Sequence, residues 1–121
     1  MGQKVAILGA SNRADRYSNI AFHLLRDYGH ETLPVSPALK ELEGVKAYAT
    51  LEDVPQPVDT LTMYIGPAHS DQIRDSILNF KAKRVIFNPG TENPSLEEAL
   101  RKAGKEVVIG CTLVMLRTNQ F

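Results

Sequence analysis

Short apolar runs alternate along this chain with segments of helical periodicity, and the alternation restricts the fold more than any other feature. The first run, Lys4–Leu8, is continuously apolar after its lysine, which is typical of a central parallel strand covered on both faces. Parallel strands need long crossover connections, so strand and helix signals in alternation favour a parallel sheet. Further strands are expected over residues 31–35, 60–65, 84–87 and 106–109.

Five such strands predict a single α/β domain over residues 1–121, Rossmann-like, with one doubly wound parallel sheet. The length and the 43% hydrophobic content suit one domain of this kind. Numbered along the chain, the strands are expected in the order 3-2-1-4-5. The ligand crevice should then lie beyond the carboxyl ends of the first and fourth strands.

Three helices are expected between the strands. The first spans residues 17–28, with a buried face predicted to hold Tyr17, Ile20, Ala21, Leu24, Leu25 and Tyr28. The second begins at Pro67, and the last begins near Pro94, where Ser95 and Glu98 have the spacing of a capping box.

Charge and composition exclude several classes of partner. Fourteen basic residues balance fourteen acidic ones, which gives no overall bias toward nucleic acid or an anionic membrane. The apolar runs are shorter than the ~20 residues of a membrane span, and no secretory signal opens the chain. The single cysteine and the three scattered histidines have no metal-site spacing. We therefore expect a soluble cytoplasmic protein without a metal.

The first loop after a strand has the ingredients of a phosphate cradle. It combines Gly9, the amino end of a helix with its free N–H groups, and two cations, Arg13 and Arg16. The match to the dinucleotide fingerprint is poor, because Ser11 stands where the second glycine belongs. The alternative is a tight turn in which Ser18 caps the helix and the arginines face solvent.

The end of the second strand discriminates between nucleotides. NAD-binding proteins place an acidic residue there to bind the ribose diol, whereas this chain has Ser36 and Pro37. This disfavours NAD and favours a ribose that carries phosphate, as in NADP or coenzyme A. Ser36 and Lys40 would then be neutral and cationic contacts, unless the segment is only a proline-rigidified loop.

Several motifs in order resemble a known family. They are "GASNRADRYS", "GHETLPVSP", "VPQPVD" and "FNPGTEN". Together they are similar to the small stand-alone coenzyme A-binding proteins, which resemble the nucleotide-binding domain of succinyl-CoA ligase and of ADP-forming acyl-CoA synthetases. The resemblance covers nearly the whole chain.

The resemblance assigns expected roles to residues of this chain. The phosphates would be held by Gly9, Ala10, Ser11, Arg16 and Ser18. The adenine would be bordered by Val35 and Pro37, and the path of the ligand would be lined by Gly66 and Pro67. The pantetheine side would be formed by Asn88, Pro89, Gly90 and Glu92.

Two functions of different class are consistent with the sequence. One is non-catalytic binding of coenzyme A or an acyl-CoA by a carrier, sensor or regulatory module. The other is an NADP-dependent or other nucleotide-dependent enzyme that uses the same loop. Spacing assembles no nucleophile with its base and no carboxylate pair, which favours a protein that is not an enzyme. By resemblance, the ligases also need a phosphohistidine segment and an ATP-grasp domain, and neither motif is found in the chain.

Two features leave alternatives open. Cys111 follows the last strand and either lies near the thiol end of the ligand or acts as a small buried hydrophobe. Gly110 stands where the family often has an arginine, which weakens a charge-assisted role for the thiol. Tyr64, Phe80 and the apolar tail over 112–121 either form a homodimer contact or complete the core.

Overall fold

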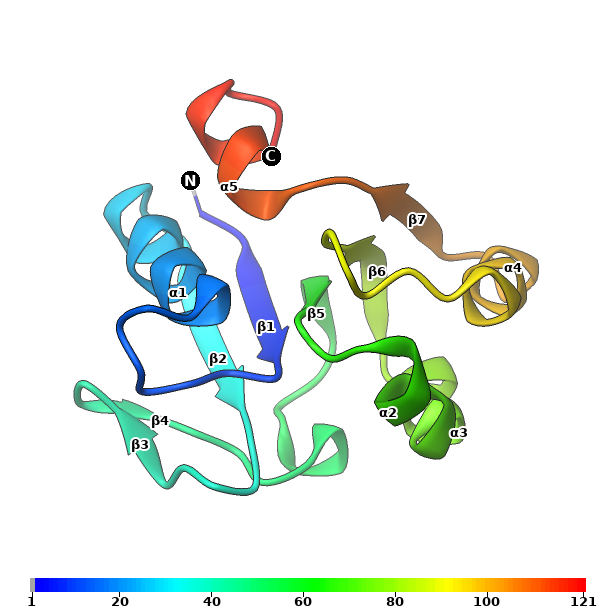
Figure 1. The fold of residues 1–121 in the computed structure, drawn as a ribbon, viewed down its shortest axis with the longest axis horizontal. Helices are drawn as coiled ribbons and strands as arrows, with labels where there is room; N and C mark the ends of the chain where they lie inside the picture. Colours follow the sequence, from blue (N-terminus) through cyan, green and yellow to red (C-terminus); the bar gives the residue numbers. More distant parts are fainter. Residues whose placement is uncertain (1) are drawn as a thin grey trace.

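The structure, a computed structural model, describes residues 2–121 (Figure 1). Its centre is a parallel sheet of five strands in the order β2-β1-β5-β6-β7. The strands are β1 Lys4–Leu8, β2 Glu31–Val35, β5 Val58–Met63, β6 Ala82–Phe87 and β7 Glu106–Ile109. A short antiparallel hairpin follows β2 and consists of β3 Glu41–Leu42 and β4 Val45–Lys46.

Helices cover both faces of the sheet (Figure 1). They are α1 Tyr17–Asp27, the 3₁₀ helix η1 Leu51–Asp53, α2 Pro67–Gln72, α3 Arg74–Asn79, α4 Pro94–Lys102 and α5 Thr112–Arg117. Alternate residues of β1 join two different clusters: Val5 packs with side chains of α1 and α5, and Ala6 packs with side chains of η1, α3 and α4. The predicted Rossmann-like α/β class is confirmed. No helix within the described residues has the length and apolar content needed to cross a membrane.

The strand order differs from the predicted 3-2-1-4-5. The third long strand along the chain, β5, pairs with β1 and does not lie outside β2. The position outside β2 is taken by Tyr48, whose N–H donates to Pro34 O (2.9 Å) and whose carbonyl accepts the Ser36 N–H (2.8 Å). The chain therefore crosses over β1, and the winding reverses between β1 and β5 instead of between the first and fourth strands.

The predicted buried face of α1 is correct for Ala21 and Leu25 and wrong for the two tyrosines at its ends. The buried residues are Ser18, Asn19, Ala21, Phe22 and Leu25. Tyr17 is 72% exposed and Tyr28 is 48% exposed. The polar start of α1 is held inward because Asn19 Nδ2 donates to Ser11 O (2.8 Å), so Tyr17 is turned outward.

The tail of the chain completes the core, as one of the two interpretations of the sequence proposed. Residues 112–117 form α5, a helix that the sequence did not predict, and its Leu113 and Leu116 are 6% and 2% exposed. Phe80 is also buried, at 2% exposure, so this side chain is covered by its own chain. The homodimer stays a prediction.

The cap of α4 is Asn93 and not the predicted Ser95. Asn93 Oδ1 accepts the Leu96 N–H (3.3 Å), while the Asn93 N–H donates to Glu97 Oε2 (2.7 Å). Asn93 Nδ2 donates to Ser70 Oγ (3.0 Å) and to Asp71 Oδ1 (2.8 Å). One buried amide therefore caps α4 and joins it to α2.

Asn93→Ala should lower the free energy of unfolding by about 2 kcal/mol, since it removes a cap and leaves buried partners unpaired. Ser95→Ala, in the exposed first turn, should change it by less than about 0.5 kcal/mol. Urea unfolding of both variants checks this, and equal losses would show that Asn93 does not cap α4.

Candidate functional site

Three cavities follow the carboxyl edge of the sheet, where β1, β2, β5 and β6 end. Their volumes are about 470, 310 and 240 Å³. Gly9 borders both the first and the second cavity, and Tyr17, Tyr64 and Pro89 border both the second and the third. The three cavities therefore form one groove across the point where the winding reverses.

The first, which we call the apolar cavity, lies between the ends of β1 and β2 and the start of α3. Its walls are largely aliphatic and are formed by Leu8, Val35, Pro37, Leu51, Ile65 and Ile73. Polar groups are contributed by Ser36, Thr50, Glu52, His69 and Ser76. A few polar groups in a mostly apolar cavity are typical of a site for a flat organic ring.

Glu52 places a carboxylate in the apolar cavity that sequence reasoning missed. An acid that binds a ribose diol is expected directly after β2, whereas Glu52 comes from η1, further along the connection to β5. A hydrogen bond with the Ser76 side chain lowers the pKa of Glu52, which favours the ionised carboxylate. The cavity can therefore accept hydrogen bonds from ligand hydroxyls.

The second, the arginine cavity, is built by the loop after β1 and by the loops after β5 and β6. Its lining includes Ser11, Arg13, Arg16, Ser18, Gly66 and Gly90. Arg13 is paired with Asp15 (Nη2 to Oδ2, 3.4 Å), whereas Arg16 forms no ion pair with the acidic side chains of residues 2–121. The Asn19 and Ile20 N–H groups donate to Arg16 O at 3.0 and 3.1 Å, so the N–H groups of Tyr17 and Ser18 are the ones that present the positive end of α1. This part of the groove favours an anion.

Gly9 and Ala10, which the resemblance places at the phosphates, have no free N–H groups to offer an anion. Both N–H groups donate to Val35 O at 3.1 Å, which anchors the loop to β2. Gly9 has φ +94°, and a Cβ there would lie 2.9 Å from both Tyr64 O and Ile65 Cγ2. Gly9 therefore permits a close approach between the loops after β1 and β5. The donors that remain available to an anion are those of α1 and of the two arginines.

The third, the terminal cavity, is lined by Tyr17, Tyr64, Asn88, Pro89, Cys111 and Leu113. Asn88 is 2% exposed and holds the cavity floor together. Its Nδ2 donates to Thr62 Oγ1 (2.7 Å) and to Met63 O (2.8 Å), and its Oδ1 accepts the Thr112 N–H (2.8 Å). The amide of Asn88 therefore stabilises the groove from beneath.

The groove collects all of the residues singled out from the sequence except Pro67, Glu92 and Lys40. Pro67 is the exposed first residue of α2, and Glu92 Oε1 accepts the Gly90 N–H (2.8 Å), which fixes the loop after β6. Lys40 is exposed and does not line the groove. Sequence reasoning missed Tyr17 and Leu113 as lining residues because it assigned both to the core or to a dimer contact.

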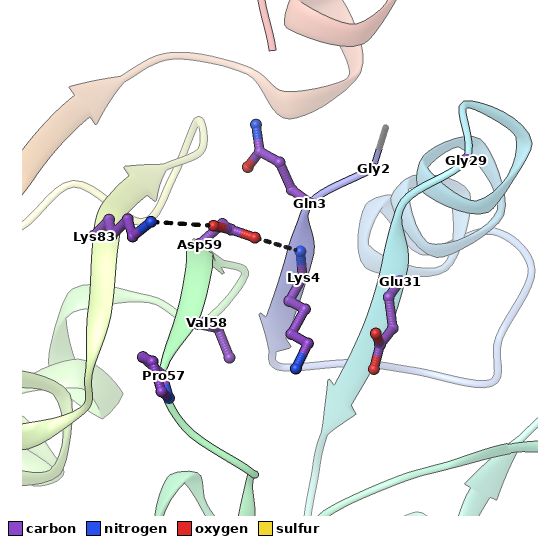
Figure 2. A pocket seen from close by; sticks show the side chains of 9 residues that line it. All are labelled: Gly2, Gln3, Lys4, Gly29, Glu31, Pro57, Val58, Asp59 and Lys83. Carbon is purple, nitrogen blue, oxygen red and sulfur yellow. Dashed lines mark hydrogen bonds and ion pairs between the residues drawn. The ribbon is translucent and has the colours of Figure 1, made fainter.

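A larger hollow of about 530 Å³ lies at the opposite, amino-terminal edge of the sheet (Figure 2). Its central carboxylate is already engaged, as Figure 2 shows. Asp59 Oδ2 accepts the Lys4 N–H (2.8 Å), and Asp59 Oδ1 lies 3.7 Å from Lys83 Nζ. In doubly wound sheets ligands bind at the carboxyl ends of the strands. We therefore identify the groove as the candidate ligand site because it lies at the carboxyl ends of the strands, although the hollow at the opposite edge is larger than any one of its three cavities.

Potential acid–base groups are sparse along the groove. His69 lines the apolar cavity, while His23 Nε2 pairs with Glu43 (2.6 Å) and His30 Nδ1 accepts the Gln3 N–H (2.9 Å). Across residues 2–121, no three or more His, Cys, Asp or Glu side chains are grouped to hold a metal ion.

The fold and the groove define the class of protein: a doubly wound α/β domain with a partly cationic groove at its topological switch point. The sequence agrees with one family of that class. The chain belongs to the CoA binding domain family, whose model matches residues 3–117. The family predicted from the sequence motifs is therefore confirmed.

Known proteins resemble the chain over different lengths. A crystal structure of an uncharacterised protein is 45% identical with a TM-score of 0.93, and the match covers 100% of this chain and 99% of the other. A Thermus thermophilus structure, cell-free ID.343, is 30% identical with a TM-score of 0.90, covering 99% and 91%. The alpha subunit of ADP-forming acetate–CoA ligase II from Pyrococcus furiosus is 36% identical over 56 residues, which cover 46% of this chain and 12% of that subunit.

Gly9→Ala should destabilise the protein more than Gly90→Ala, by about 1–3 kcal/mol. Both glycines have positive φ, at +94° and +90°, so both variants carry a similar backbone strain. Only the Gly9 Cβ would meet other atoms, because nothing lies within 4 Å of the Gly90 position. Urea unfolding compares the two variants, and equal stabilities would argue against the close approach of the two loops.

Proposed function

We propose that this protein binds coenzyme A along the groove without catalysing a reaction on it. The order of the three cavities carries the proposal. An apolar cavity, a cationic segment and a second, mostly apolar cavity follow one another along the sheet edge. Coenzyme A has the same order of parts, with an adenosine, a pyrophosphate and a pantetheine arm.

The adenine is assigned to the apolar cavity, between Val35, Pro37 and Ile73. The pyrophosphate is assigned to the arginine cavity, where Arg16, Ser18 and the first N–H groups of α1 provide donors. The pantetheine arm then passes Gly66 and Pro89 toward the terminal cavity. Membership of the CoA binding domain family supports this ligand.

The alternative is an enzyme that uses NAD, NADP or another nucleotide. Its support is Glu52, whose carboxylate lines the apolar cavity and could accept hydrogen bonds from a ribose diol. Calorimetric titration with coenzyme A, NADP and NAD at one ionic strength separates the two functions. Binding of coenzyme A alone supports the proposal. Preference for NADP or NAD would instead favour the nucleotide-dependent enzyme.

Arg16→Ala should weaken coenzyme A binding about tenfold, because it removes a charge-assisted contact from a partly exposed site. Arg13→Ala should weaken it less, since Asp15 already neutralises part of the Arg13 charge. Calorimetry on both variants measures the difference. Wild-type affinity in Arg16→Ala would refute the phosphate assignment.

Acetyl-CoA incubated with the protein should remain intact. The hydroxyls of Thr62 and Thr112 beneath the terminal cavity are bonded to each other (2.8 Å), and Thr62 Oγ1 also accepts from Asn88. Neither hydroxyl is therefore activated by a base. The rate of thiol release, followed with a thiol reagent after subtraction of the protein's own Cys111 signal, should equal that of buffer alone, and protein-dependent turnover would show a catalytic function.

A further inference from the structure

The terminal cavity differs in chemistry from the rest of the groove. None of its six lining residues is Asp, Glu, His, Lys or Arg. Two aromatic rings, a proline ring, a leucine and a thiol form most of its walls, contributed by Tyr17, Tyr64, Pro89, Leu113 and Cys111. A ligand group that enters this cavity leaves the cationic segment behind and meets mostly apolar surface.

The polar side chains around the terminal cavity are already occupied. Both N–H donors of the Asn88 amide and one acceptor position of its oxygen are used within the protein. Thr62 and Thr112 are 0% exposed and bond to each other. Burial raises the pKa of Tyr64 to about 12, so its hydroxyl is neutral at physiological pH. The walls therefore offer little to replace the water around a charged group.

Tyr17 gives this cavity an exposed aromatic wall. Its side chain is 72% exposed at the start of α1, although it borders both the arginine cavity and the terminal cavity. An exposed aromatic ring beside a cavity gains free energy when a ligand covers it with apolar surface. Tyr28, on the same helix, is 48% exposed and lines none of the three cavities.

We propose that the terminal cavity is an acyl subsite, which holds the short apolar acyl group of a coenzyme A thioester. This inference rests on the proposed function, because it places the sulfur end of the ligand beyond the phosphates. The cavity volume of about 240 Å³ equals that of roughly eight liquid water molecules at ~30 Å³ each. That space suits an acyl group of butyryl size together with the end of the pantetheine arm.

The test compares four ligands by calorimetry, in reducing buffer so that Cys111 forms no disulfide: coenzyme A, acetyl-CoA, butyryl-CoA and succinyl-CoA. Each buried methylene is worth roughly fourfold in affinity, so butyryl-CoA should bind about tenfold more tightly than acetyl-CoA. Succinyl-CoA has the same number of acyl carbons but ends in a carboxylate, and it should bind at least tenfold more weakly than butyryl-CoA.

The outcomes separate this inference from the proposed function. Equal affinity for all four ligands, or preference for succinyl-CoA, overturns the acyl subsite and leaves coenzyme A binding intact. Failure of all four ligands to bind overturns the proposed function, and the subsite with it.

The variant Tyr17→Ala locates the effect within the terminal cavity. It should reduce the ratio of butyryl-CoA to coenzyme A affinity severalfold, because one apolar wall is lost. The matched control Tyr28→Ala should leave that ratio at the wild-type value. Both side chains are exposed, so neither change removes a core contact. An unchanged ratio in Tyr17→Ala would place the acyl group elsewhere.

Discussion

One buried amide, that of Asn88, holds together the edge of the sheet on which the groove depends. It bonds to Thr62 and Met63 at the end of β5 and to the start of α5 at Thr112. The backbone carbonyl of Asn88 accepts the N–H and the hydroxyl of Thr91, which closes the loop after β6. Three segments that are distant in sequence therefore share a single polar centre, shielded from water.

The sequence predicts the class of fold because each central strand must be apolar on both faces and each crossover must be long. It does not predict the strand order, since the edge beside β2 is occupied by an isolated backbone bridge between Val35 and Tyr48 and not by a full strand. Tyr48 occupies the outer edge of β2 through two backbone hydrogen bonds, which leave no side-chain pattern. The start of α1 was misread for a similar reason, because Asn19 turns a polar face inward to reach Ser11.

The loops of the candidate site are predictable because parallel strands place their carboxyl ends at one edge, so motifs after different strands must meet. Which backbone and side-chain groups of those loops are free to contact a ligand is less predictable. Gly9 and Ala10 look like anion donors, but Val35 O binds both N–H groups. Glu52 and Leu113 enter the groove from segments that carry no recognisable motif, and only the folded chain brings them there.

Hydrogen bonds within residues 2–121 shape the groove. Val35 O holds the first loop, Glu92 and Thr91 hold the loop after β6, and Asn88 fixes the floor. The groove is thus preorganised, and binding needs little ordering of the backbone. Most of the conformational entropy lost on association then belongs to the ligand and to the two arginine side chains. For a long and flexible ligand, the conformational entropy of the ligand then limits affinity more than any rearrangement of the protein does.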